Sequence, residues 1–193
     1  MYEILQSKLS ARSKPIDVIV VGLGFMGFGF ISSVRMAKGI RVPLIISRRP
    51  SDAITYLENQ GIKSKLSDNP SEIMTNANNG IISVSDDLDL IDKLESDVVM
   101  EVTGTISYGT EVALKAIKAK KHIVTMNPEL QATVGTRLKT LADKAGVVIT
   151  DVTGDQPGSL ARLVGQTRFM GFKVLLAGNM KRYLNRHATN EDM

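Results

Sequence analysis

Cysteine is absent from the 193-residue sequence, and histidine occurs only as His122 and His187. The absence of cysteine excludes disulfide bridges, thiolate zinc sites and cysteine nucleophiles. Two histidines are too few for a three-histidine metal site, and we predict no bound metal. No charge of one sign dominates either, because 24 Lys and Arg face 20 Asp and Glu along the whole chain. The net charge of +4 is too diffuse to indicate a nucleic-acid partner.

Long hydrophobic runs are also scarce. Residues 1–15 carry four charged side chains and no continuous apolar core, so they do not have the pattern of a secretory signal. The longest apolar stretch, Val18–Ile31, contains four glycines and is shorter than the roughly 20 residues that cross a membrane. The sequence therefore predicts a cytoplasmic protein with no membrane partner.

Composition and periodicity predict a globular α/β protein. Apolar residues make up 43% and charged residues 23%, which excludes wholesale disorder, collagen-like repeats and a coiled coil. The β-branched run Ile16–Val21 is typical of a strand buried on both faces. Further strands are predicted over residues 42–46, 81–84, 97–102, 122–126, 147–150 and 173–177. Strands that alternate with helical patterns predict a parallel sheet covered on both faces.

Helical patterns lie between these runs. They cover residues 2–12, 25–38, 51–61, 88–94, 110–118 and 159–169, and one more helix ends at Gly146. Ser51 is the predicted N-cap of its helix. Residues 64–80 are rich in Ser, Asn and Asp, and predict a loop with a short helix over 71–75.

A glycine-rich turn follows the first predicted strand. The segment Gly22-Leu23-Gly24-Phe25-Met26-Gly27 matches G-x-G-x-x-G between a buried strand and a helix. In a dinucleotide site Gly22 permits the tight turn, Gly24 lets the backbone approach a pyrophosphate, and Gly27 brings the helix close to the strand. The alternative is a glycine-rich turn of another α/β protein. The context favours a cofactor site at these residues and a Rossmann-type doubly wound parallel sheet.

The end of the second predicted strand indicates which dinucleotide is bound. An NAD site carries Asp or Glu about 20 residues after the loop, where it accepts from the ribose 2′-hydroxyl. Here Ser47, Arg48 and Arg49 occupy this place, and no carboxylate occurs before Asp52. Guanidinium groups suit a 2′-phosphate, so these three residues predict NADP, with NAD possible. The alternative is a pair of solvated arginines in a surface turn.

Further segments carry a family resemblance that extends over nearly the whole chain. They are Lys14-Pro15-Ile16 with the glycine loop, Glu101-Val102-Thr103-Gly104, His122-Ile123-Val124-Thr125-Met126-Asn127, Gly154-Asp155-Gln156-Pro157-Gly158, Gly171-Phe172-Lys173-Val174 and Ala177-Gly178-Asn179-Met180-Lys181. The chain resembles homoserine dehydrogenase-like oxidoreductases with a C-terminal SAF domain, a family that includes deoxyxylulose-phosphate reductoisomerase-like enzymes. The resemblance implies an NAD(P)-dependent enzyme acting on a small hydroxylated or carbonyl metabolite. It also implies that Thr103, Gly104 and Thr105 line the nicotinamide side and that Asn127 contacts the carboxamide or the substrate. The alternative for Thr103 and Thr105 is that they are plain turn residues.

The resemblance has two departures. Homoserine dehydrogenases have Asn-Lys after the corresponding strand, whereas Asn127 is followed by Pro128 here, which argues against homoserine as the substrate. Members of the family are also more than twice as long, so a truncated or missing substrate domain is expected. The expected domains are a helical arm (1–14), a Rossmann domain (15–177) and the start of a substrate or dimerisation domain (178–193). A homo-oligomer is left open for the intact protein.

Three residues are candidates for the chemistry. Lys181 is a candidate acid or charge clamp, and Glu129 and Asp155 are candidates for binding substrate hydroxyls or orienting a lysine. The alternatives are an exposed lysine in a basic tail and an aspartate that holds its own turn. Glu101, inside an apolar strand, is interpreted as structural and needs a partner.

These observations favour an NADP-dependent oxidoreductase with a small-molecule substrate. The alternative is a non-catalytic dinucleotide-binding module or an inactive fragment, because such a domain alone lacks a pocket for the second reactant. A third function, nucleic-acid binding through the basic tail 181–187, is not favoured, because no platform of aromatic side chains for stacking bases accompanies this tail.

Overall fold

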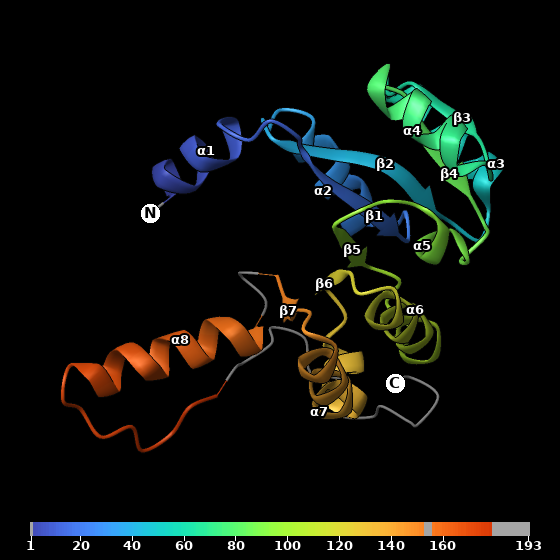
Figure 1. Cartoon of the computed structure of the whole chain (residues 1–193). Helices are drawn as coiled ribbons and strands as arrows, with labels where there is room; N and C mark the ends of the chain where they lie inside the picture. Colours follow the sequence, from blue (N-terminus) through green and yellow to red (C-terminus); the bar gives the residue numbers. More distant parts are fainter. Residues whose placement is uncertain (1, 153–155, 179–193) are drawn as a thin grey trace. The chain divides into compact units, whose positions relative to one another are not determined.

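The computed structural model describes residues 2–152 and 156–178. The chain divides into two compact units, Met1–Asp151 and Val152–Met193. The strands of the first unit are β1 (Ile16–Val21), β2 (Ile40–Ile46), β3 (Ser64–Leu66), β4 (Ile82–Ser85), β5 (Val98–Glu101), β6 (His122–Thr125) and β7 (Ile149–Asp151). They form one parallel sheet in the order β3-β4-β2-β1-β5-β6-β7 (Figure 1).

Seven helices accompany these strands within the described part of this unit. They are α1 (Tyr2–Ser10), α2 (Phe25–Val34), α3 (Pro50–Asn59), α4 (Pro70–Asn78), α5 (Leu90–Lys93), α6 (Ile106–Lys118) and α7 (Pro128–Ala145). Each helix from α2 to α7 lies between two consecutive strands, which is the doubly wound parallel α/β architecture predicted from the sequence.

The sheet is buried on both faces. Alternate residues of β1 and β2, namely Ile19, Val21, Leu44 and Ile46, belong to one core with buried residues of α4, α5, α6 and α7. The intervening residues of the same strands are buried too, and they face the opposite side of the sheet, which α2 and α3 contact. This two-sided burial explains why β1 is a nearly continuous run of β-branched residues.

A bulge in β2 accommodates a proline in the middle of the sheet. The register of β1 with β2 moves from Asp17–Arg41 to Ile19–Leu44, so β2 has one extra residue around Pro43. Proline has no backbone N–H to give to a neighbouring strand, and a bulge is one of the few places in a sheet where it is tolerated. The guanidinium of Arg41 bonds both carboxylate oxygens of Asp17, at 2.6 and 2.7 Å, beside the bulge.

The strand order creates a switch point next to β1. The chain runs from β1 to β2 and on to β3 and β4 on one side, and then crosses to β5 on the other side. The carboxyl ends of β1 and β5 therefore flank a crevice, where ligands bind in open α/β sheets. This crevice lies directly at the glycine-rich turn after Val21.

Several local predictions are wrong. Residues 64–80 contain the predicted helix over 71–75, but as part of the longer α4, and the part predicted as loop includes the strand β3. Ser51 is not an N-cap: α3 begins at Pro50, and Arg49 occupies the cap without a side-chain hydrogen bond. The strand predicted over 173–177 is absent, because these residues have no regular secondary structure.

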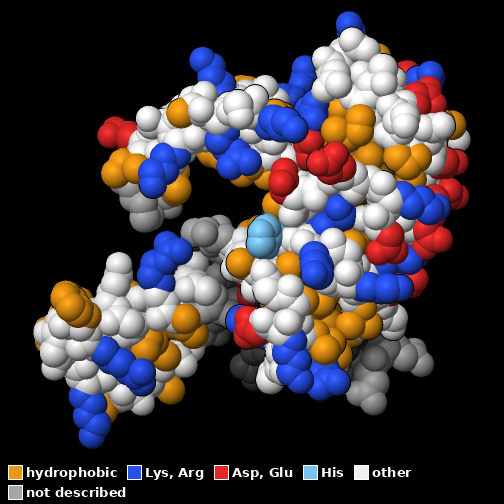
Figure 2. Space-filling view, in the orientation of Figure 1, with side chains coloured by type: hydrophobic (Ala, Val, Ile, Leu, Met, Phe, Trp, Pro, Cys, Tyr) orange, Lys and Arg blue, Asp and Glu red, His pale blue; other side chains and the backbone are white. Residues whose placement is uncertain are grey.

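The second unit is described from its helix α8 (Gln156–Phe169) to residue 178. Large apolar side chains of this segment are exposed, and Figure 2 shows hydrophobic side chains on its surface; they are Leu163, Phe169, Met170, Phe172, Leu175 and Leu176. Among the described residues of both units, no helix is both long and apolar enough to cross a membrane. The predicted domain limits at residues 14 and 177 stay predictions.

Candidate dinucleotide site

A cavity of about 250 Å³ lies at the carboxyl ends of β1, β2 and β5. Its lining joins the glycine loop, the turn after β2 and the turn after β5; the residues are Gly22, Leu23, Gly24, Ile46, Ser47, Arg48, Arg49, Val102, Thr103, Thr105 and Tyr108. Seven of these residues are among the cofactor-binding residues predicted from the sequence. The fold therefore brings the two predicted cofactor segments and the predicted nicotinamide segment to one place.

The three glycines of the loop meet different surroundings. Gly22 has a φ of +104°, and a Cβ there would lie 2.8 Å from the carbonyl oxygen of Val102. A Cβ on Gly27 would lie only 2.3 Å from the carbonyl oxygen of Gly22, so α2 approaches the loop closely. A Cβ on Gly24 would meet nothing within 4 Å, which leaves open space beside the loop backbone. This is the division into turn, ligand approach and helix packing that the motif predicts.

The first turn of α2 follows directly after Gly24, which lines the cavity. Gly24 is the N-cap and has no side chain to satisfy the first amides of the helix, and the first intrahelical bond is donated by Phe28. The side chains of Phe25 and Met26 are 91% and 44% exposed, so they do not cover the turn. Unsatisfied amides at a helix N-terminus favour a negatively charged group such as a phosphate.

The turn after β2 holds the two predicted arginines at the cavity. The N–H of Ser47 donates to the carbonyl oxygen of Ser85 at 2.9 Å, which fixes the turn to the end of β4. Arg49 is exposed and lies 3.5 Å from Asp52, also exposed. Arg48 forms no ion pair with any residue in the described part of the chain. Its charge is therefore available to a ligand.

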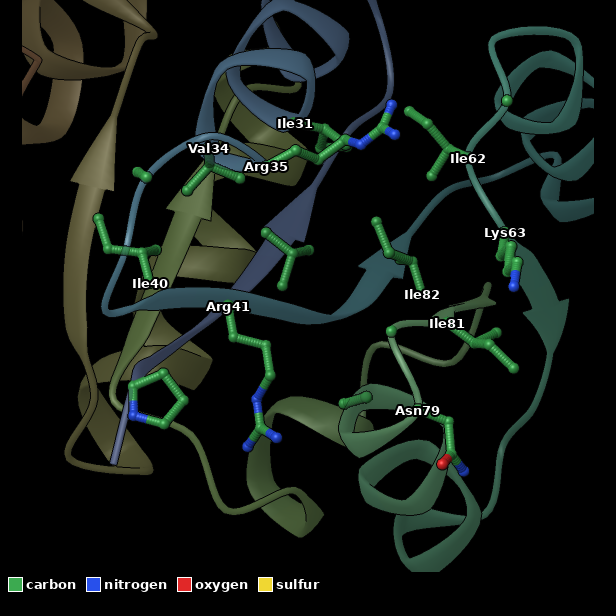
Figure 3. A pocket seen from close by; sticks show the side chains of 16 residues that line it. Ile31, Val34, Arg35, Ile40, Arg41, Ile62, Lys63, Asn79, Ile81 and Ile82 are labelled. Atoms are coloured by element: carbon green, nitrogen blue, oxygen red, sulfur yellow. The ribbon is translucent and has the colours of Figure 1, made fainter. Parts of the chain in front are cut away.

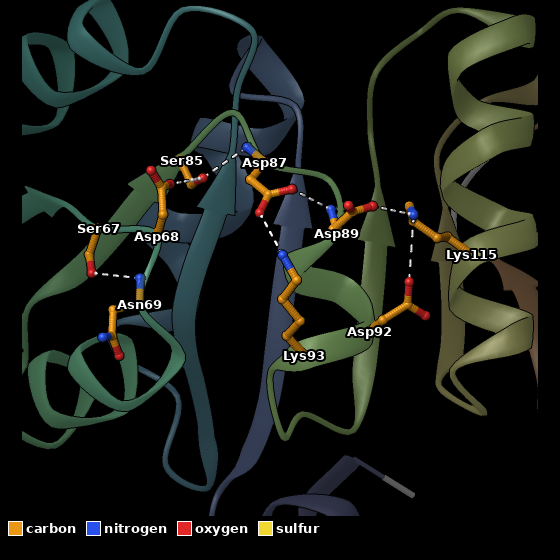
Figure 4. Close-up of polar contacts among 9 residues, drawn as sticks. All are labelled: Ser67, Asp68, Asn69, Ser85, Asp87, Asp89, Asp92, Lys93 and Lys115. Carbon is orange, nitrogen blue, oxygen red and sulfur yellow. Dashed lines mark hydrogen bonds and ion pairs between the residues drawn. The ribbon is translucent and has the colours of Figure 1, made fainter.

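Four aspartates of the segments after β3 and β4 are paired with lysines or held by hydrogen bonds (Figure 4). Asp68 accepts a bond from Ser85, and Asp87 pairs with Lys93. Lys115 pairs with Asp89 and Asp92, and its hydrogen bond holds the pKa of Asp89 below the usual value. These pairs order the segment after β4, to which the turn of Ser47 is attached.

The turn after β5 rests on a buried carboxylate. Glu101 is fully buried, and its Oε1 accepts bonds from the Thr103 N–H at 2.8 Å and the Thr103 hydroxyl at 2.6 Å. Its Oε2 accepts from Thr125 at 2.7 Å. Gly109 of α6 packs on this carboxylate, since a Cβ there would lie 3.1 Å from Oε1. Glu101 therefore has the structural partners that the sequence interpretation required.

Asn127 is buried beneath the same turn. Its Oδ1 accepts from the N–H of Leu130 at 3.1 Å and caps α7, and its Nδ2 donates to the carbonyl oxygen of Thr105 at 3.0 Å. The side chain thus supports Thr105 from inside the protein. Gly104, between the two threonines, is exposed and has a φ of +69°.

Tyr108 is a cavity residue that sequence reasoning missed. It lies in the first turn of α6, lines the cavity with Arg48, and is half-buried. Burial raises the pKa of its hydroxyl and Glu111 raises it further, while Arg48 acts in the opposite direction, so the hydroxyl is protonated at neutral pH. Its position directly after the predicted nicotinamide segment was the only available signal.

Of the three predicted catalytic residues, the structure describes only Glu129. Glu129 is exposed in the first turn of α7 and does not line the cavity. Asp155 and Lys181 lie outside the described residues. Within the described ranges, no group of three or more His, Asp or Glu side chains is placed to hold a metal ion.

A larger cavity, of about 680 Å³, lies at the amino ends of β2 and β4 (Figure 3). Its lining includes Ile40 at the start of β2, Ile82 at the start of β4, and Arg35 just after α2. Ligands of open α/β sheets bind at the carboxyl ends, so the smaller cavity is the candidate cofactor site.

Comparison with known proteins agrees with this geometry. The family described as "Homoserine dehydrogenase, NAD binding domain" matches residues 22–150, from the first glycine of the loop to β7. Homoserine dehydrogenase of Neisseria gonorrhoeae is 31% identical over 136 residues, and that of Pseudomonas aeruginosa is 30% identical over 146 residues. Each match covers 70% of this chain and 28% of the relative.

A solved structure of a homoserine dehydrogenase from Thiobacillus denitrificans is similar in fold. It has a TM-score of 0.55 and 26% identity, and the match covers 72% of this chain and 29% of that one. The chain thus spans less than a third of the length of the relatives that it matches.

Proposed function

The chain belongs to the family of homoserine dehydrogenase NAD-binding domains, and on this premise we propose that it binds NADP as the cofactor part of an oxidoreductase. The family indicates a nicotinamide dinucleotide. The observation that carries the choice of NADP is Arg48 at the cavity, next to Ser47 and Arg49, which forms no ion pair with any of the described residues. A 2′-phosphate requires such cations, whereas a 2′-hydroxyl is bound by a carboxylate at this place.

The residues present fit this group. The loop Gly22–Gly27 and the first amides of α2, including those of Phe25 and Met26, would hold the pyrophosphate, because Gly24 leaves the backbone open. Ser47, Arg48 and Arg49 would hold the 2′-phosphate. The turn Thr103–Thr105 would lie along the nicotinamide side, supported by Asn127. When bound, the nicotinamide supplies hydride transfer, and the chain supplies binding and orientation.

The substrate we propose is a small hydroxylated or carbonyl metabolite other than homoserine. Pro128 begins α7 directly after Asn127, so this turn offers no lysine side chain to a substrate. Glu129, Asp155 and Lys181 stay predictions for the chemistry of the intact protein. A cytoplasmic location, a C-terminal SAF domain and a homo-oligomer are likewise proposals.

The second candidate is a dinucleotide-binding module without turnover. It is favoured by the lining of the described cavity, which includes predicted cofactor-binding residues but not Glu129, the one predicted catalytic residue that the structure describes. The two candidates share the cofactor site and differ in activity, so oxidation of NADPH with a panel of aldehydes and ketones separates them.

Titration with NADPH and NADH tests the cofactor proposal. We expect NADPH to bind at least tenfold more tightly than NADH, because a charge-assisted hydrogen bond contributes about 1.5–3 kcal/mol. Arg48→Ala should remove most of this preference by weakening NADPH binding alone. Arg35→Ala is the matched control. Arg35 is exposed as well, but it lines the larger cavity at the amino ends of β2 and β4. Equal affinities in the unaltered protein would exclude the NADP preference, and no saturable binding of either nucleotide would exclude the function.

A further inference from the structure

Glu101 is a buried ionisable group at the back of the cofactor cavity to which the family resemblance gives no function. It is fully buried, and no Lys, Arg or His forms an ion pair with it in the described part of the chain. Its partners are instead the N–H and hydroxyl of Thr103, the hydroxyl of Thr125 and the amide nitrogen of Asn127. All of these groups donate to it, which is the pattern around a carboxylate.

The position of the Thr103 proton follows from these contacts. A threonine hydroxyl has one hydrogen, and the 2.6 Å bond directs it inward to Oε1 of Glu101. The neighbouring N–H of Thr103 donates to the same oxygen at 2.8 Å, so the turn is held at two points. The Thr103 oxygen is therefore left with lone pairs only, and Thr103 lines the cavity.

The same constraint extends only weakly to Thr105, which also lines the cavity. The Thr105 hydroxyl and N–H both lie 3.5 Å from the Thr103 oxygen, which is long for a hydrogen bond, so the fixed acceptor at this wall is Thr103, whose hydrogen is held by the 2.6 Å bond to Glu101.

We propose that Glu101 is a positioning residue that makes Thr103 an obligate hydrogen-bond acceptor at the nicotinamide side of the cavity. The ligand group it selects is a donor, and on a nicotinamide dinucleotide the donor on the ring is the carboxamide NH₂. Recognition of this amide distinguishes the cofactor from a ring that carries no donor. The inference rests on the proposed function, because it concerns the same cavity.

A pair of nucleotides that differ only at this group tests the inference. Oxidised NADP carries the carboxamide, and its 3-acetylpyridine analogue carries an acetyl group that accepts but does not donate. The unaltered protein should bind NADP about fivefold more tightly than the analogue, the range of one neutral hydrogen bond. Thr103→Val should reduce this ratio to about one, and Thr103→Ser, which keeps the hydroxyl, should restore it.

Glu101→Met tests the positioning itself, because it removes the acceptor behind Thr103 and leaves Thr103 in place. The ratio should fall to about one in this variant as well, with folding checked by cooperative thermal unfolding. If this variant does not fold, the comparison of Thr103→Val with Thr103→Ser tests the proposal. Thr110→Val is the matched control, since the Thr110 hydroxyl bonds the carbonyl oxygen of Ile106 within α6 and does not line the cavity.

The outcomes separate this inference from the proposed function. Equal binding of NADP and the analogue by the unaltered protein, or an unchanged ratio in Thr103→Val or in folded Glu101→Met, would overturn the inference while leaving the cofactor site intact. Failure to bind either nucleotide would overturn the proposed function first.

Discussion

The close approach of α2 to the glycine loop can be tested at Gly27, where substitution by alanine adds one methyl group. A Cβ at this position would lie 2.3 Å from the carbonyl oxygen of Gly22, a backbone atom that cannot rotate away. Gly27→Ala should therefore push the helix from the loop, with a cost of about 1–3 kcal/mol in the free energy of unfolding, the range for overpacking. The loop and the helix N-terminus would no longer meet correctly, so NADPH affinity should fall at least tenfold. Urea unfolding and nucleotide titration measure the two effects.

Gly29 provides the control within the same helix. A Cβ at Gly29 would meet nothing within 4 Å, and its backbone conformation suits any residue. Gly29→Ala should stabilise the protein by about 0.5–1 kcal/mol, because alanine loses less conformational entropy in a helix than glycine does. Unchanged stability and unchanged nucleotide binding in Gly27→Ala would contradict the close approach.

At the scale of elements, Asn69 decides where α4 begins. Its side-chain oxygen accepts from the N–H groups of Ser71 and Glu72 at 2.9 and 3.2 Å, and Pro70 occupies the first helical position. Asn69→Ala should cost about 1 kcal/mol, the usual contribution of an N-cap. Ser51→Ala is the control, because Ser51 lies inside α3 and does not cap it, and it should change stability by less than about 0.5 kcal/mol. Urea midpoints compare the variants, and an equal loss in both would contradict the assignment.

The sequence predicts best those helices and strands whose apolar residues follow a clear pattern. The strand Ile16–Val21 is observed as predicted, and Gly146 ends α7 in the left-handed conformation. The element β3 was missed because only its three residues Ser64–Leu66 pair at the edge of the sheet, and two of them are polar. The helix α4 was predicted too short, although Asn69-Pro70 is a readable start signal. The strand predicted over 173–177 has the apolar residues but pairs with no strand in the described structure.

The parts of the candidate site that consist of short sequence motifs were predictable, whereas the hydrogen bonds between segments distant in the sequence were not. The glycine loop and the arginine turn are short motifs, and both line the cavity. The bonds that hold the turns in place join distant segments, such as Ser47 to Ser85 and Glu101 to Asn127. Such pairs depend on which strands are neighbours in the sheet. One sequence does not specify that order at the level of individual hydrogen bonds.

At the scale of the whole molecule, charges of the two signs are nearly balanced, with 24 Lys and Arg against 20 Asp and Glu. In the face shown in Figure 2, Lys and Arg side chains are interleaved with Asp and Glu over the unit that contains the sheet. Most described ion pairs involve partly or largely exposed side chains, so each contributes little to stability. The pH dependence of unfolding is therefore expected to reflect the buried ionisable groups most strongly.

Lys121 is such a group, and it is 7% exposed. Its Nζ donates to the carbonyl oxygens of Leu94 and Ser96 at 2.8 and 3.1 Å, which ties the end of α6 to the turn before β5. Burial lowers the pKa of Lys121 from its ordinary value of 10.5, and the negative charges of Asp97, Asp92 and Glu95 oppose this shift only in part. A neutral amine has two hydrogens, so both carbonyl contacts persist when the proton is lost.

The lowered pKa of Lys121 predicts that its contribution to stability increases with pH. Between the folded pKa and 10.5 the unfolded state binds more protons than the folded state, so the free energy of unfolding rises with pH in this window. Lys121→Met lacks this titration. The stability difference between the unaltered protein and the variant should therefore shift in favour of the unaltered protein from about pH 7 to about pH 10. Urea unfolding at constant ionic strength measures both profiles, and parallel profiles would show that the folded and unfolded states hold this proton equally.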